Sequence, residues 1–134
     1  FMTAETTIDM PSFGAAAGES VPGTVEEQYN IGLSYDHTIG SKSAYTRVDY
    51  LYYGESYATF GQSEDQMSPA YEKFNLNWGV DLNENSSLQL SIDNLMDNRT
   101  EAFKFSADSP GWRPRNYLQW IPPRSVSLRY TYRY

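Results

Sequence analysis

Residues 73–82 read Lys-Phe-Asn-Leu-Asn-Trp-Gly-Val-Asp-Leu, so that apolar side chains occupy every second position from Phe74 to Leu82. Successive side chains of a β-strand point to opposite faces of the sheet. An alternation of this length therefore predicts a strand with one apolar and one polar face. A helix would scatter the same residues around its axis, so a helix is excluded here.

Four other segments repeat this alternation. Apolar residues recur at every second position from Tyr29 to Tyr35, from Val48 to Tyr52, from Leu88 to Ile92 and from Val126 to Tyr134. We therefore expect strands at about 26–36, 43–55, 71–82, 87–96 and 124–134, with a frayed sixth strand near residues 3–8. The expected fold class is all-β, an antiparallel up-and-down meander.

The connections between these strands alternate in length. The connections at residues 37–42 and 83–86 are short and polar, and both contain residue types that favour hairpin turns. The connections at about 9–25, 56–69 and 97–123 are long. Loops of this length are uncommon in compact domains and are often functional, so we expect the long connections to carry the function.

Strand length and aromatic placement favour a membrane barrel over a soluble sandwich. Ten residues at about 3.3 Å each, tilted by about 40°, reach about 25 Å, the height of an outer-membrane apolar band. Aromatic residues gather near the ends of the apolar faces, as in an interfacial girdle. The sequence thus predicts five to six strands of a transmembrane β-barrel, which is fewer than a whole barrel wall. The residues expected to face lipid are Leu76, Trp78, Val80, Leu90, Ile92, Val126, Leu128, Tyr130, Tyr132 and Tyr134.

Composition excludes several classes of protein. Ten basic and seventeen acidic residues give a net charge of -7 over 134 residues, which offers no footprint for nucleic acid. The aromatic content of 16% is too high for a disordered segment. Cysteine is absent, which excludes disulfides and thiolate metal sites. The chain opens on Phe1, and we expect that it is a piece whose start is not included.

The sequence offers only weak candidates for a catalytic or metal-binding site. His37 is the only histidine, and we interpret it as a solvated turn residue, because a metal site needs clustered donors. Without an available base no Ser-His-Asp triad can form. Glu64 and Asp65 could bind calcium, but their spacing does not fit an EF-hand and favours a solvated acidic tip. We therefore expect no enzymatic activity, no metal and no cofactor.

The long connection at 97–123 is the candidate ligand-binding segment. Aromatic residues are interleaved there with basic ones, and these residue types often bind ligands and partners. A cationic set of this kind would suit an anionic ferric chelate. The alternative is a loop that folds over the barrel mouth and buries its aromatic side chains. The candidates are Phe103, Lys104, Phe105, Trp112, Arg113, Arg115, Tyr117 and Trp120.

Several landmarks together resemble one family. The last twelve residues, Pro123 to Tyr134, end on an aromatic residue after a Pro-Arg and an alternating strand. This stretch resembles the closing strand of TonB-dependent outer-membrane receptors. Ile92-Asp93-Asn94-Leu95-Met96-Asp97-Asn98-Arg99 is similar to that family's Asn-Leu-x-Asp motif, and the resemblance runs from about residue 21 to the end.

The resemblance implies a place in a larger protein. That protein would be a 22-stranded, plugged barrel in the outer membrane of a Gram-negative bacterium, and this chain would supply its last five to six strands. Its partners would be the lipid bilayer, the N-terminal remainder of the barrel with its plug, the TonB energy-coupling system and a small-molecule ligand such as a ferric siderophore. The strand pattern leaves two alternatives open, a passive porin and a secreted β-sandwich that binds carbohydrate.

Overall fold

The computed structural model describes residues 2–3, 7–8, 19–62, 64–107 and 115–134. The chain divides into two compact units. Unit 1 comprises residues 1–29, 52–71 and 99–121, and unit 2 comprises residues 30–51, 72–98 and 122–134. Among the described residues, no helix is long and apolar enough to cross a membrane.

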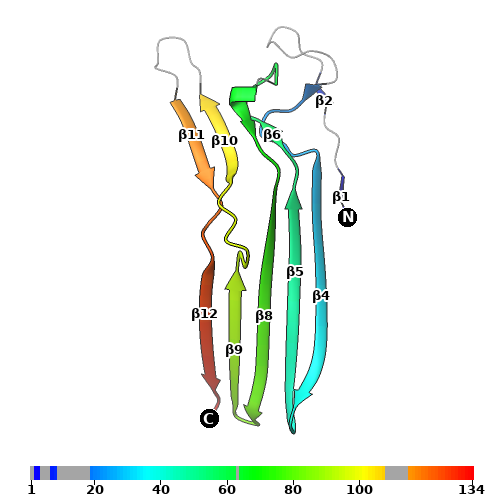
Figure 1. Ribbon diagram of the computed structural model, residues 1–134, viewed down its shortest axis with the longest axis vertical. Helices are drawn as coiled ribbons and strands as arrows, with labels where there is room; N and C mark the ends of the chain where they lie inside the picture. The colour runs from blue at the N-terminus through cyan, green and yellow to red at the C-terminus, as the bar shows by residue number, and fades with distance from the viewer. Residues whose placement is uncertain (1, 4–6, 9–18, 63, 108–114) are drawn as a thin grey trace. The chain divides into compact units, whose positions relative to one another are not determined.

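The main sheet is an antiparallel meander, which confirms the all-β class. Its hydrogen-bonded order is β1-β4-β5-β8-β9-β12. Strands that follow one another along the chain are thus neighbours from β4 to β12 (Figure 1). The strands are β1 (Met2–Thr3), β4 (Glu27–Ile39), β5 (Lys42–Tyr53), β8 (Tyr71–Asn83), β9 (Ser86–Asp93) and β12 (Ser125–Tyr132).

Short strand pairs form within the three long connections that the sequence predicted, and one of them includes Thr7–Ile8 from the frayed strand expected near residues 3–8. All of these pairs lie in unit 1, as does the 3-10 helix η2 (Glu64–Gln66). The clearest difference is at 97–123, where the described residues form a β-hairpin. The pairs are β2 (Thr7–Ile8) with β3 (Glu19–Ser20), β6 (Ser56–Tyr57) with β7 (Met67–Ser68), and β10 (Glu101–Ala107) with β11 (Arg115–Trp120).

Two tight turns in unit 2 join its long strands. The β4–β5 turn contains Gly40 and Ser41, and Gly40 has a φ of 64°. A positive φ at the first central position is typical of type II′ hairpin turns, which favour glycine there. In the β8–β9 turn, the Asn85 N–H donates to Asn83 Oδ1 at 3.0 Å.

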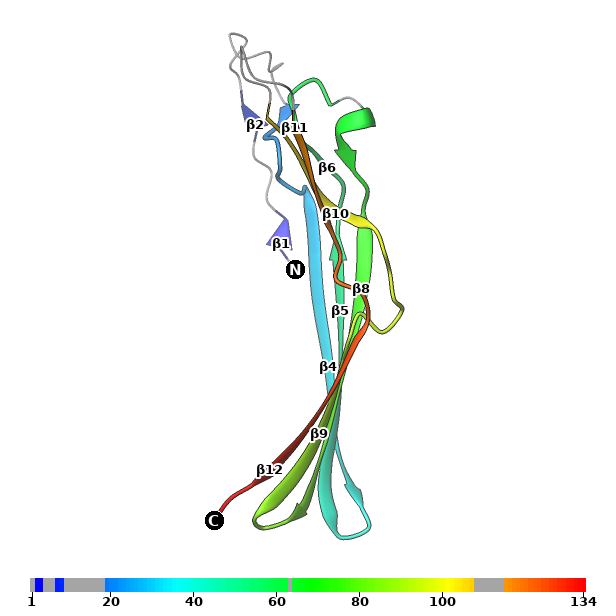
Figure 2. The same cartoon turned by 90° about the vertical axis from the view of Figure 1, so that its left-hand side faces the viewer.

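The strands of unit 2 pair in register, so that apolar residues form rows on one face. The clearest rows are Leu76–Ile92–Val126 and Trp78–Leu90–Leu128. A third row joins Val80, Leu88 and Tyr130. Directly opposed residues share one face of a sheet, and Figure 2 shows the twist of the β9 and β12 backbones that carry these rows.

The described residues bury few large side chains. The buried hydrophobic residues among them are Ala44, Ala58, Val80 and Ile121. By contrast, Leu33 is 73% exposed and Leu128 is 68% exposed, although both belong to the apolar alternation. On this face of unit 2, Leu33 of β4 and Leu128 of β12 are therefore not covered by other described residues.

Candidate functional site

The expected ligand-binding residues lie largely on the β10–β11 hairpin of unit 1. Phe103, Lys104 and Phe105 belong to β10, and Arg115, Tyr117 and Trp120 belong to β11. The register opposes Phe105 to Tyr117 and Lys104 to Leu118, with an irregularity between Glu101 and Phe103. The hairpin therefore brings the aromatic residues of two separate chain segments onto shared faces.

Part of the expected set is outside the described structure. Trp112 and Arg113 are outside the described residues, and so are the side chains of Phe105 and Arg115. Tyr117 and Trp120 are 53% and 55% exposed, so both present aromatic surface.

Lys104 has partners within unit 1. Its Nζ donates to the carbonyl oxygen of Asp65 at 3.0 Å and lies 3.6 Å from Glu101 Oε2. Only 16% of its side chain is exposed. The charge of Lys104 is thus already balanced by a neighbouring carboxylate, which weakens its case as the group that attracts an anionic ligand.

Phe103 packs against the chain near Gly23. Gly23 has a φ of 78°, and its N–H donates to the carbonyl oxygen of Tyr57 at 2.8 Å. A Cβ added at Gly23 would lie 3.3 Å from Phe103 Cε2. Phe103 is therefore a packing residue of the hairpin base, in line with the alternative in which aromatic side chains are buried.

The ten residues expected to face lipid fall on or next to the apolar rows of unit 2. Val126, Leu128, Tyr130 and Tyr132 are exposed on β12, and Tyr134 follows the strand. Leu76, Trp78, Leu90 and Ile92 are half-buried by their row neighbours. Val80 differs, because its side chain is buried. Tyr50 joins the same face, since its ring lies 4.9 Å from that of Phe74.

The opposite face of unit 2 is polar. An ideal Cβ on Gly32 would lie 2.7 Å from both Arg47 Nη2 and Asp49 Oδ1, so these side chains cross over Gly32. Arg47 Nη2 donates to Asp49 Oδ1 at 2.6 Å. Tyr45 lies in the same way over Gly79, whose ideal Cβ would be 2.8 Å from Tyr45 Cζ.

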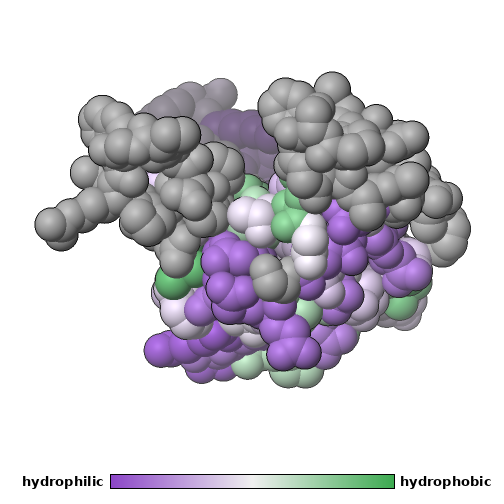
Figure 3. Space-filling model, turned by 90° about the horizontal axis from the view of Figure 1, so that it is seen from above, coloured by the Kyte–Doolittle hydropathy of each residue, from purple (hydrophilic) through white to green (hydrophobic). Residues whose placement is uncertain are grey.

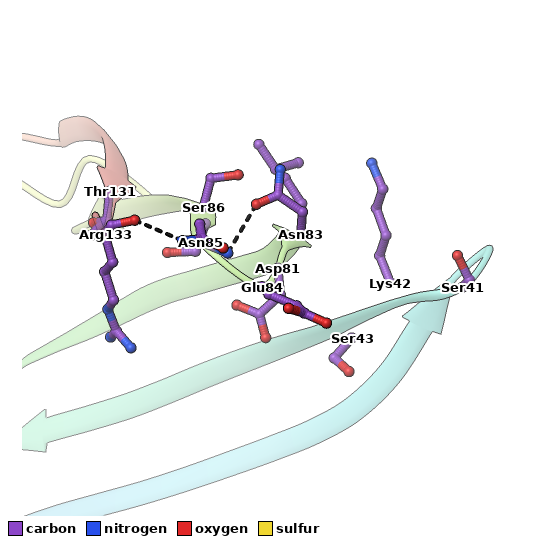
Figure 4. A pocket seen from close by; sticks show the side chains of 12 residues that line it. Ser41, Lys42, Ser43, Asp81, Asn83, Glu84, Asn85, Ser86, Thr131 and Arg133 are labelled. Carbon is purple, nitrogen blue, oxygen red and sulfur yellow. Dashed lines mark hydrogen bonds between the residues drawn. The ribbon is translucent and has the colours of Figure 1, made fainter.

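A polar pocket of about 530 Å³ lies in unit 2 beside the β8–β9 turn. Its lining mixes acidic Asp81 and Glu84 with basic Lys42 and Arg133 (Figure 4). Asn85 connects the turn to the end of β12, since its Nδ2 donates to the Arg133 carbonyl oxygen at 2.9 Å. The pocket lining carries no dominant charge that would select an anion or a cation.

Among the described residues, the metal-binding candidates are not grouped with further metal-ligating side chains. The interpretation of His37 as a solvated turn residue is wrong, because it lies half-buried within β4. Its Nδ1 is 3.3 Å from the Tyr35 carbonyl oxygen, and the rings of His37 and Tyr35 stack at 5.4 Å. Glu64 and Asp65 form the exposed start of η2. In the part of the chain that is described, no three His, Cys, Asp or Glu side chains are grouped to hold a metal.

Sequence reasoning missed the role of Asn94. This residue follows β9, has a φ of 52° and is 2% exposed, and its backbone N–H donates to Asn75 Oδ1 at 3.0 Å. Its position in the Asn-Leu-x-Asp stretch marked it in the sequence. The hydrogen bonds that give it a role join residues far apart along the chain, so no local pattern could reveal them.

Comparisons with known proteins identify no relative. No protein-family model matches the chain, and no curated protein or solved structure matches it significantly.

Proposed function

We propose that this chain is the C-terminal part of the barrel wall of a TonB-dependent outer-membrane receptor. The observation that carries the proposal is the apolar face of unit 2, whose rows are in register across β8, β9 and β12 and whose β12 side chains are exposed. In water, such a face would normally be covered by a second layer. Lipid is the solvent in which it needs no cover.

The polar face supports the same proposal. The Arg47–Asp49 pair and Tyr45 lie on the side opposite the apolar rows, as lumen-facing residues of a barrel would. The free edge of β12 would pair with another strand of the complete barrel, because unpaired backbone groups are not tolerated in hydrocarbon. The receptor would bind its ligand through outer connections, of which the β10–β11 hairpin is the best candidate.

The ligand would be a scarce nutrient such as a ferric siderophore, and the charge distribution bears on its class. Segments of unit 1 hold ten acidic and four basic residues, a formal charge of −6, whereas unit 2 holds seven and six, a charge of −1. In the view of Figure 3, hydrophilic residues make up most of the coloured surface. A neutral or cationic complex fits this field better than an anionic one.

The Tyr57 hydroxyl is affected by the negative charges of unit 1. The pKa of its hydroxyl is raised above the ordinary value of 10.0, first by desolvation and then by the negative charge of Glu55. Glu26 and Glu64 act in the same direction. Three acidic side chains of unit 1 therefore act on this one hydroxyl group.

A pair of neighbouring substitutions tests the lipid-facing assignment. Leu128→Arg places a charge in the middle apolar row, and Ser127→Arg places the same charge on the opposite face. In the full-length protein folded into lipid vesicles, we expect Leu128→Arg to lower the free energy of unfolding by about 2–4 kcal/mol. Ser127→Arg should cost far less, and denaturant titration measures both.

Equal effects of the two variants would contradict the proposal. In a water-soluble sandwich whose apolar face is as open as it is here, Leu128→Arg would be close to neutral, because surface substitutions usually change stability by about 0.5 kcal/mol or less.

A further inference from the structure

The side-chain amide of Asn94 joins the two ends of residues 99–121, the excursion of the chain that contains the β10–β11 hairpin. Asn94 Nδ2 donates to the carbonyl oxygens of Asn98 and Pro122, each at 2.9 Å. Asn94 Oδ1 accepts the N–H of Asn98 at 3.0 Å. Asn98 directly precedes and Pro122 directly follows residues 99–121, which contain the hairpin. The Asn94 side chain thus holds together the chain segments that lead into and out of that excursion.

Neighbouring contacts reinforce this junction. The Arg124 N–H donates to Asp97 Oδ1 at 2.9 Å, and the Asp97 N–H donates to the Asn94 carbonyl oxygen at 2.8 Å. The Leu95 N–H donates to the carbonyl oxygen of Phe74 at 2.7 Å. Asn94, Asp97 and their partners, which we call the junction, therefore join the segment after β9 to β8 and to the segment before β12.

Asparagine suits the hydrogen bonds and the backbone conformation of position 94 better than aspartate or glycine does. The side chain supplies two N–H donors and one acceptor, and all three are used. Aspartate keeps the shape but loses both donors. Glycine tolerates a φ of 52° but has no amide, and most other residues disfavour this backbone conformation.

We propose that Asn94 is the positioning residue of the β10–β11 hairpin. Its amide sets the separation of the two chain segments that enter and leave residues 99–121, which contain the hairpin. The functional part of this inference rests on the proposed role of the hairpin in ligand binding, whereas the positioning itself is measured without any ligand.

Hydrogen exchange of the full-length protein in detergent micelles tests the proposal. Asn94→Gly keeps the backbone conformation and removes the amide, and Asn94→Asp keeps the shape and removes the donors. We expect exchange of the Ile121 amide to become about tenfold faster or more in both variants. Exchange of the Asn98 amide should become faster in Asn94→Gly, since only this variant removes the oxygen that accepts the Asn98 N–H. Exchange in β8 and β9 should stay unchanged, as should the heat-modifiable band shift of the folded barrel.

Asn85→Asp is the matched control. It removes an exposed hydrogen bond that the Asn85 side-chain amide donates to the Arg133 carbonyl oxygen at the β8–β9 turn. It should leave exchange at Asn98 and Ile121 as in the wild type.

The pH dependence of Asn94→Asp separates positioning from a general loss of packing. Once its new carboxyl group is protonated, this variant regains one O–H donor at the junction, so its exchange rate should approach that of the wild type as the pH falls. The Asn94→Gly variant should show no such recovery.

Three results would overturn the proposal: unchanged exchange at Asn98 and Ile121, equal recovery of both variants at low pH, or loss of the folded barrel in both. The last result would make Asn94 a requirement of the sheet itself. None of these results depends on a ligand, so each is distinguishable from a failure of the receptor assignment.

Discussion

Tyr45 and Gly79 show how one missing side chain shapes the polar face of unit 2. The Tyr45 ring occupies the space that a Cβ at position 79 would need, with Tyr45 Cε1 and Cζ both closer than ordinary contact. The two residues lie far apart in the sequence but on neighbouring strands, β5 and β8. Glycine at 79 is therefore required by the aromatic ring, and not by its own backbone conformation.

We expect Gly79→Ala to destabilise the protein by about 1–3 kcal/mol, because the added methyl group displaces the ring. Equilibrium unfolding in denaturant measures the difference. In a Tyr45→Ala background the same substitution should be almost neutral, since the space is then open. If Gly79→Ala costs as much without the ring as with it, the steric explanation is wrong.

Contacts of individual residues such as these could not be predicted from the sequence. The alternation placed Gly79 on the polar face correctly, but nothing near it in the sequence names Tyr45 as the occupant of its space. Asn94 is similar, because the carbonyl oxygen of Pro122 that it binds is 28 residues away. Both contacts depend on strand pairing, and one sequence does not specify register between distant strands.

At the scale of elements, the β4–β5 hairpin depends on its two-residue turn. Gly40 has a positive φ, and no side chain lies within 4 Å of its ideal Cβ. A substitution there would be strained by the backbone alone. We expect Gly40→Ala to lower the free energy of unfolding by about 1–2 kcal/mol, and Ser41→Ala in the same turn to have little effect.

Thermal unfolding followed by circular dichroism compares the two turn variants. A neutral Gly40→Ala would show that the turn adopts another backbone conformation.

The long strands were predictable and the β10–β11 hairpin was not. In β8, apolar residues alternate without interruption from Phe74 to Leu82, and the observed strand, Tyr71–Asn83, closely matches the expected range of 71–82. In β10, the alternation is reduced to Phe103 and Phe105 around Lys104, and prolines at 110 and 114 follow. Such a short pattern does not separate a strand from a loop.

β9 ends earlier than the alternation suggested. The expected range reached residue 96, but the strand stops at Asp93 because Asn94 turns the chain with a φ of 52°. Leu95 and Met96 are apolar and look like a continuation of the strand in the sequence. The backbone conformation of the residue before them decides the boundary.

At the scale of the whole molecule, acidic charge is concentrated in one unit. Unit 1 carries −6 of the net charge of -7. Acidic surfaces steer cations and slow the approach of anions, most strongly at low ionic strength. This distribution opposes the anionic chelate suggested by the basic residues of the hairpin alone.

We expect neutralisation of unit 1 to change association rates in opposite directions for opposite ligands. The triple variant Glu26→Gln, Glu55→Gln, Glu64→Gln of the full-length protein should bind a cationic ferric complex several-fold more slowly at low salt, and an anionic complex of similar size faster. Stopped-flow tryptophan fluorescence measures both rates.

A matched triple variant in unit 2, Asp36→Asn, Asp81→Asn, Glu84→Gln, removes the same charge from the charge-balanced unit. It should change neither rate appreciably. Faster binding of the cationic complex after neutralisation of unit 1 would contradict the assigned ligand class.

The junction at Asn94 also bears on how this protein can diversify. One amide binds both Asn98 and Pro122, so the two ends of residues 99–121 are held together by a residue outside that segment. This closure does not depend on the sequence between the ends. Residues 99–121 then resemble a cassette between fixed ends, one that mutation can lengthen, shorten or replace without disturbing the sheet. Grafting a foreign peptide between these ends is the corresponding use in engineering.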